Sequence, residues 1–101
     1  MIMSKISPLI HPGLILRDEF FAPLGITQLA AAKATGIPQS RLSEILAGRR
    51  SITADTAARL GRFFQVDPRS WLNLQAMFDL REMERSHGWE LSRVIPAEQM
   101  A

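Results

Sequence analysis

Residues 26–46 read ITQLAAAKATGIPQSRLSEIL, and this stretch decides the fold. It predicts two short helices joined by a turn. Thr27 can cap the start of the first helix, and Gly36 suits the left-handed turn that follows a helix. The second helix begins at Pro38 and carries apolar residues on one face, at i, i+3 and i+4 spacing: Leu42, Ile45 and Leu46. The two helices can pack at a steep angle because small residues line their contact: Ala30, Ala31 and Ala34.

The polar side chains of the second helix of this pair are expected to face outward: Gln39, Ser40, Arg41, Ser43 and Glu44. Amide, hydroxyl and guanidinium groups hydrogen-bond the base edges and phosphates of DNA. Gln28 lies at the start of the first helix, where unpaired backbone N–H groups can meet a phosphate. Arg49 and Arg50 follow the second helix and can grip the DNA backbone on its far side. We therefore predict that residues 27–46 read duplex DNA, against the alternative of a helical hairpin with solvated polar residues.

Two further helices are expected around this pair, and they make the predicted fold all-α. Residues 12–22 have apolar side chains at helical spacings behind a proline at the helix start, and Pro23 and Gly25 should end that helix. Thr53 is expected to cap another helix with four inward apolar residues: Ala57, Leu60, Phe63 and Phe64. No strand pattern appears before residue 89.

A fifth and longest helix is expected over about residues 68–87, with Asp67 as its cap and Gly88 as its stop. Residues 88–101 then follow as a short tail. The stretch from Trp89 to Ile95 alternates loosely between polar and apolar side chains, so we predict that this tail is extended.

The fifth helix has two apolar faces. At 100° per residue, Leu74 and Phe78 lie within about 60° of Trp71, which we expect to anchor the core. A second set is centred roughly 135° away from Trp71: Leu72, Ala76, Leu80 and Met83. A small monomer needs only one such stripe, so the second predicts a two-fold dimer joined through this face. The alternative is that the tail covers it through Trp89 and Leu91.

Charge is distributed unevenly along the chain, although the formal net charge is only +2. Residues 27–66 carry six basic and two acidic side chains, whereas residues 67–101 carry four arginines and six acidic side chains. Most of the basic residues are arginine, whose planar guanidinium suits phosphates and guanine edges. The basic middle predicts a surface for DNA, and the acidic end predicts a different partner.

The length and composition of the chain fit a single domain over residues 1–101. There is no cysteine, which excludes a disulfide framework and thiolate ligands. His11 and His87 lie far apart in sequence, and no pair of carboxylates has a metal-binding spacing. We therefore expect no metal, no cofactor, no catalytic residues and no enzyme activity. Residues 1–10 lack a secretory signal and no apolar run is long enough to span a membrane, so we expect a cytoplasmic protein.

The sequence resembles the Xre or phage-repressor type of helix-turn-helix protein, and within it the HigA-like (VapI-like) antitoxins. The matching segments span residues 11 to about 85: His11-Pro12-Gly13, residues 27–30 (TQLA), residues 41–53 (RLSEILAGRRSIT), residues 71–75 (WLNLQ), and Asp79-Leu80. The resemblance implies a five-helix repressor that dimerises, binds an operator in its own promoter and neutralises a small ribonuclease toxin of the HigB type. It also implies Gln28 as a phosphate ligand, and four residues for the major groove: Gln39, Ser40, Arg41 and Ser43. With two-fold symmetry, the operator is expected to be an inverted repeat.

Two alternatives stay open at this point. The chain could be a stand-alone regulator of the same fold without a toxin, which the neighbouring open reading frame would decide. It could also be a protein-interaction module whose helix-turn-helix is vestigial. The basic residues around one helix favour DNA over this second alternative: Arg41, Arg49 and Arg50.

Overall fold

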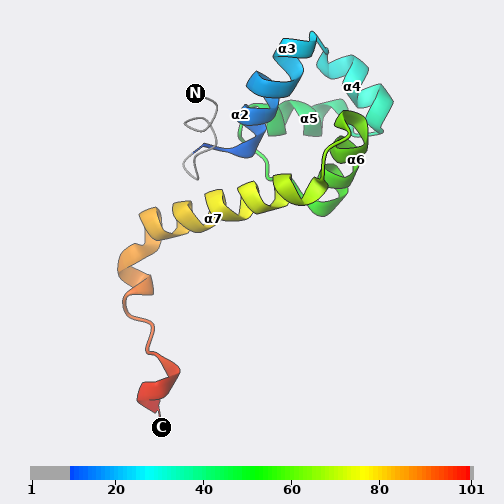
Figure 1. The fold of residues 1–101 in the computed structure, drawn as a ribbon. Helices are drawn as coiled ribbons and strands as arrows, with labels where there is room; N and C mark the ends of the chain where they lie inside the picture. Colours follow the sequence, from blue (N-terminus) through cyan, green and yellow to red (C-terminus); the bar gives the residue numbers. More distant parts are fainter. Residues whose placement is uncertain (1–9, 101) are drawn as a thin grey trace.

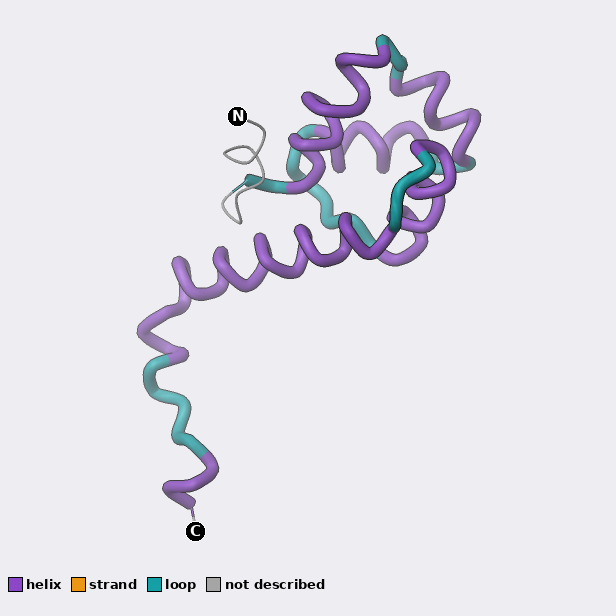
Figure 2. Tube along the Cα trace, viewed as in Figure 1, coloured by secondary structure: helices purple, strands orange, loops and turns teal. Residues whose placement is uncertain are grey.

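The computed structural model describes residues 10–100 (Figure 1). Predictions for residues 1–9 and for residue 101, the end of the tail, lie outside this range. Within it the chain forms helices and loops and no strand, which confirms the all-α prediction (Figure 2). The elements are, in order, α2 (Pro12–Leu16), the π-helical η1 (Arg17–Phe21), α3 (Ala22–Leu24), α4 (Gln28–Thr35), α5 (Gln39–Leu46), α6 (Ala54–Phe64), α7 (Pro68–Leu91) and the 3-10 turn η2 (Ala97–Met100).

The predicted first helix consists of α2, η1 and α3 in one continuous run, and it does not end at Pro23 as expected. In η1 the N–H of Ala22 donates to the carbonyl of Arg17, five residues earlier. A proline inside an α-helix clashes with the carbonyl four residues before it, and the wider π turn gives Pro23 room. The run ends at Gly25, which takes a left-handed φ of 64°.

The helix pair predicted at the centre of the chain is α4 and α5. Thr27 caps α4 as predicted, because its hydroxyl oxygen accepts a hydrogen bond from the N–H of Ala30 at 3.1 Å. Gly36 ends α4 with a φ of 77°. The apolar face of α5 is buried as predicted: Leu42, Ile45 and Leu46. The predicted helix contact through three alanines is confirmed only for Ala31, which is fully buried, whereas Ala30 and Ala34 are exposed.

The core is closed by the first half of α7, and Trp71 anchors it as predicted. This side chain is 3% exposed, and its ring packs edge-on against Phe20 with the centroids 4.9 Å apart. Its indole N–H has no hydrogen-bond partner among the described residues. Other buried apolar side chains of the core come from α2, α4, α5, α6 and the turn before α5: Leu16, Ala31, Ile37, Leu42, Ile45, Ala57 and Leu60.

The predicted extended tail is wrong. Helix α7 bends at His87, which has a φ of −129° and a ψ of 22°, and then continues through Gly88 to Leu91. An extended segment needs a neighbouring strand for its backbone groups, and the described part of the chain offers none, whereas a helix pairs its own. The second half of α7 and the segment after it therefore project from the body as an arm (Figure 1).

The start of α2 sets the position of α5. His11 caps α2, because its Nδ1 accepts a hydrogen bond from the N–H of Gly13 at 2.9 Å. Pro12 occupies the first turn, where its missing N–H leaves no bond unmade. A Cβ on Gly13 would lie 1.7 Å from the carbonyl oxygen of Ile45. Only glycine therefore lets α2 approach α5 this closely.

Candidate DNA-binding surface

The first turn of α5 carries three of the residues predicted to contact bases. Gln39 and Ser40 are exposed, and Arg41 is half-buried. Ser43 lies one turn further along and is also half-buried. The structure therefore brings Gln39, Ser40 and Arg41 together at the end of the helix that a helix-turn-helix presents to base edges.

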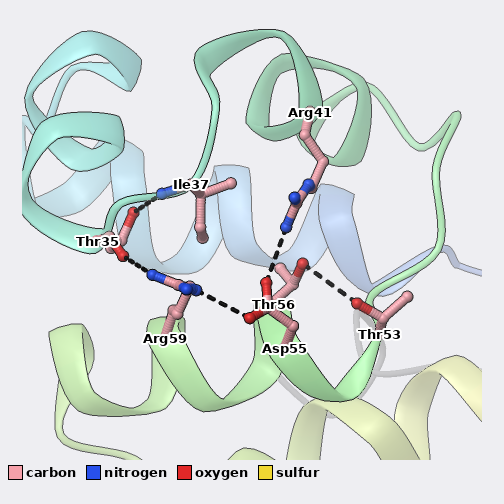
Figure 3. Close-up of polar contacts among 7 residues, drawn as sticks. All are labelled: Thr35, Ile37, Arg41, Thr53, Asp55, Thr56 and Arg59. Atoms are coloured by element: carbon pink, nitrogen blue, oxygen red, sulfur yellow. Dashed lines mark hydrogen bonds and ion pairs between the residues drawn. The ribbon is translucent and has the colours of Figure 1, made fainter.

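Arg41 is bound to α6 by an ion pair that the sequence did not indicate (Figure 3). Its Nη1 donates to Oδ2 of Asp55 at 2.9 Å, and Oδ1 of the same carboxylate accepts from Nε of Arg59 at 3.0 Å. Hydrogen bonds from Arg59 and then from Arg41 lower the pKa of the Asp55 carboxyl. Asp55 is therefore ionised at neutral pH and draws the Arg41 side chain toward α6.

Arg59 continues this network to the turn between α4 and α5. Its Nη1 donates to the carbonyl of Thr35 at 2.9 Å, and the Thr35 hydroxyl accepts from the N–H of Ile37 at 3.2 Å (Figure 3). A Cβ on Gly36 would lie 2.7 Å from Nη1 of Arg59, so the turn packs directly against this guanidinium. The network joins the turn between α4 and α5 to α6 and, through Asp55, to the first turn of α5.

The loop after α5 presents the two arginines predicted to grip the DNA backbone. Gly48 opens it with a left-handed φ of 75°, and Arg49 and Arg50 are both exposed. Nη2 of Arg50 pairs with Oε1 of Glu44 on α5 at 3.0 Å. Glu44 was predicted to face outward, and the structure shows that it ties Arg50 to α5.

Gln75 on α7 holds the same loop through a hydrogen bond, and the sequence did not indicate this residue as functional. Gln75 on α7 is 5% exposed, and its Oε1 accepts a hydrogen bond from the N–H of Ile52 at 2.9 Å. Its Nε2 donates to Oδ1 of Asp79 at 2.9 Å, which fixes the orientation of the amide. A polar residue on the core side of α7, among apolar neighbours, was the only signal in the sequence.

His11 contacts the loop and α7 as well as capping α2. Its ring packs edge-on against Phe78 with the centroids 5.1 Å apart. Burial lowers the pKa of His11, and the charge of Asp79 and a hydrogen bond with the backbone of Arg50 oppose this shift. Because Nδ1 must be unprotonated to accept from Gly13, the neutral imidazole is the form that fits the fold.

Gln28 is the first residue of α4, as the phosphate role requires, and it is half-buried. It borders a hollow in the surface together with Arg17 and Leu46. The sequence did not place Arg17 near the predicted site, because the two segments are brought together only by the packing of η1 against the helix pair. The Arg17 guanidinium is paired with its neighbour Asp18, from Nε to Oδ1 at 2.8 Å.

The described residues contain no group of three or more His, Cys, Asp or Glu side chains that could hold a metal ion. Over the same part of the chain, no helix is long and apolar enough to cross a membrane.

The second apolar stripe of α7 is uncovered over most of its length. Leu80 is 61% exposed, Met83 is 40% exposed, and Ala76 is also exposed. Leu72 differs from the prediction, because it is half-buried and packs against the core. The alternative that the tail covers the stripe is wrong, since the tail leads away from the body and its Trp89 is 63% exposed (Figure 1).

The structure has two helices joined by a tight turn, with a polar first turn on the second helix and an arginine loop beside it. These features define a helix-turn-helix protein of the DNA-binding class.

Comparisons with known proteins agree with this class. A family model described as "Helix-turn-helix" matches residues 19–71. Virulence-associated protein I of Dichelobacter nodosus is 50% identical over 77% of this chain and 72% of its own length, and antitoxin HigA-1 of Vibrio cholerae is 33% identical over 83% and 79%. The Pseudomonas aeruginosa antitoxin HigA, solved with the higBA promoter, has a TM-score of 0.83 and 36% identity over 88% of this chain and 98% of its own.

The chain therefore belongs to the helix-turn-helix family, in its HigA-like (VapI-like) branch. This confirms the resemblance drawn from the sequence. The family consists of DNA-binding regulators and antitoxins, which agrees with the expectation that the chain is not an enzyme.

Proposed function

We propose that this chain is a dimeric transcriptional repressor and antitoxin, which binds an inverted-repeat operator in its own promoter and neutralises a ribonuclease toxin of the HigB type. The observation that carries the proposal is the polar first turn of α5 with arginines beside it. A relative solved with promoter DNA supports this mode of binding. Because such a protein acts on chromosomal or plasmid DNA, we expect it in the cytoplasm.

In this proposal the first turn of α5 enters the major groove. Gln39 and Arg41 have the side chains that form paired hydrogen bonds with adenine and guanine edges, and Ser40 can add a single one. Ser43, one turn along the same face, is the fourth proposed groove residue. These contacts would give the sequence preference, whereas contacts to phosphates only position the protein.

Phosphate contacts are proposed on both sides of α5. Gln28 at the start of α4, near Arg17, would hold one stretch of backbone. Arg49 and Arg50 in the loop after α5 would hold another. Phosphate neutralisation supplies affinity for any duplex and depends on salt, with each contact releasing about one ion.

We further propose that the protein is a homodimer joined through the second apolar stripe of α7: Leu72, Ala76, Leu80 and Met83. With 24 residues, α7 is the longest helix of the described chain, and its second half projects away from the body (Figure 1). One recognition helix also makes too few contacts for tight specific binding, and a second copy doubles them. The exposed part of the stripe, Ala76 to Met83, is where contact is expected to be closest.

The test of the DNA-binding role is a gel shift with a duplex from the promoter upstream of the gene and a scrambled duplex of equal composition. The double variant Gln39→Ala, Arg41→Ala should lose the preference for the promoter duplex, at about 1–3 kcal/mol for each lost base contact. Its thermal melt should match that of the wild type. If the double variant kept the preference, the reading role would belong to other residues.

The toxin-neutralising role is tested separately by expressing the product of the neighbouring open reading frame with and without this chain. We expect growth arrest from the neighbour, and rescue when this chain is present. If the neighbour is harmless and the promoter is still bound, the chain is a stand-alone regulator of the same fold. If neither DNA nor the neighbour is affected, the helix-turn-helix is vestigial.

A further inference from the structure

We propose that Asp55 is a positioning residue that sets the sequence specificity of Arg41, with Arg59 holding Asp55 in place. The inference rests on the proposed function, because it concerns which duplexes the first turn of α5 prefers. It adds two residues of α6, neither of which need touch a base, to the determinants of specificity.

The geometry gives Arg41 one fixed neighbour. Its guanidinium meets the carboxylate through a single atom, Nη1, at 2.9 Å, and no other hydrogen bond of this side chain occurs among residues 10–100. The remaining N–H groups of the guanidinium are therefore available to a base edge. Asp55 restricts where they point, because one end of the planar guanidinium is bonded to its carboxylate.

The carboxylate is itself held on its other side. Arg59 occupies Oδ1 of Asp55 and reaches the carbonyl of Thr35, which is a backbone atom at the end of α4. The position of Asp55 is therefore fixed relative to the turn between α4 and α5.

The negative charge of Asp55 acts differently on the two kinds of DNA. On a duplex without the right base, an unrestrained arginine would turn to the nearest phosphate, and Asp55 competes with that phosphate for the guanidinium. On a duplex with the right base, the held guanidinium already points toward the groove and loses little freedom on binding. Asp55 should therefore lower affinity for nonspecific DNA more than affinity for the operator.

The experiment compares wild type and Asp55→Asn on two duplexes at several salt concentrations: the promoter fragment that the wild type protects, and a scrambled duplex of equal composition. We expect affinity for the scrambled duplex to rise and its salt dependence to steepen by about one ion, because Arg41 becomes free to bind a phosphate. The ratio of the two affinities should fall by roughly ten-fold.

A matched control and a second background separate this role from a general effect of charge. Glu82→Gln removes one negative charge and one arginine partner on α7, away from α5, and should leave the ratio unchanged. In an Arg41→Ala background, Asp55→Asn should have no further effect on the ratio, because the residue through which it acts is missing. Circular dichroism shows whether each variant is folded, and Asp55→Ser takes the place of Asp55→Asn if the latter is not.

Three outcomes would overturn the inference. The first is that Asp55→Asn changes affinity for both duplexes by the same factor. The second is that its effect on the ratio persists without the Arg41 side chain. The third is a wild type with no preference for any promoter duplex, which would contradict the proposed function as well, whereas the first two leave that function standing.

Discussion

Gly13 and Gly88 both lie in helices, but only Gly13 has a neighbour where a side chain would be. A Cβ at Gly13 would overlap the carbonyl of Ile45, whereas a Cβ at Gly88 would have nothing within 4 Å. Gly13→Ala should therefore displace α2 from α5 and destabilise the fold by about 1–3 kcal/mol or more. Gly88→Ala should leave stability unchanged or raise it by up to about 1 kcal/mol.

Urea denaturation followed by circular dichroism measures both glycine variants under the same conditions. Equal stability of Gly13→Ala and wild type would mean that α2 does not set the position of α5.

His11 makes the stability of the fold depend on pH. Its pKa is lowered from 6.5 in the folded chain, so between these two values only the unfolded chain binds the proton. This contribution to the free energy of unfolding is fully present above the unfolded pKa, and it declines as the pH falls below that value toward the folded pKa. Protonation also removes the acceptor that caps α2.

The variant His11→Asn keeps a capping acceptor and does not titrate. The loss of stability between about pH 7.5 and about pH 5.5 should therefore be smaller in this variant than in the wild type. Acidic groups that titrate in this range cancel in the difference between the two proteins. A difference of zero would mean that the histidine keeps its ordinary pKa.

At the scale of elements, the loop that carries Arg49 and Arg50 depends on a side chain of α7. Gln75→Ala would leave the buried N–H of Ile52 without its partner, and an unpaired buried group costs about 1–3 kcal/mol. We expect that loss in chemical denaturation, together with weaker binding to all duplexes because the arginine loop is no longer held. Asn73→Ala, an exposed amide on the same helix, is the control and should change stability by less than about 0.5 kcal/mol. Equal effects of the two variants would mean that Gln75 does not hold the loop.

The helix pair could be predicted from sequence because its signals are local. A threonine cap, a glycine at the turn and an apolar face at helical spacing each act within a few residues, and Thr27, Gly36 and Leu42 lie where these signals put them. The end of the first helix and the tail were missed for the opposite reason. The π turn relieves the clash of Pro23 with the preceding helical turn. The conformation of residues 88–100 depends on whether a pairing strand exists elsewhere in the chain.

The exposed residues of the candidate site could be predicted from the sequence, whereas the residues that hold them in place could not. Residues that face outward from α5 follow from helical periodicity alone. The partners of Arg41 do not, because Asp55 is 14 positions away and the two meet only through the packing of α5 on α6. The bond from Gln75 to Ile52 crosses 23 positions and depends likewise on tertiary structure.

At the scale of the whole molecule, the arm formed by α7 predicts an oligomer. Light scattering should show a dimer for the wild type and a monomer for Leu80→Glu, because a charge on the exposed stripe opposes its burial. The monomer should bind operator DNA much more weakly, since it offers one recognition helix instead of two. A monomeric wild type, or a Leu80→Glu variant that stays dimeric, would place the interface elsewhere.

The central claim is that two copies of this chain read an inverted repeat through the first turn of α5. Hydroxyl-radical footprinting on the promoter upstream of its gene tests this most directly. We predict two protected tracts, related by symmetry and about 34 Å or one helical turn apart on one face of the duplex, that disappear with the double variant Gln39→Ala, Arg41→Ala. Absence of protection, a single asymmetric tract, or the same footprint from the double variant would contradict the account.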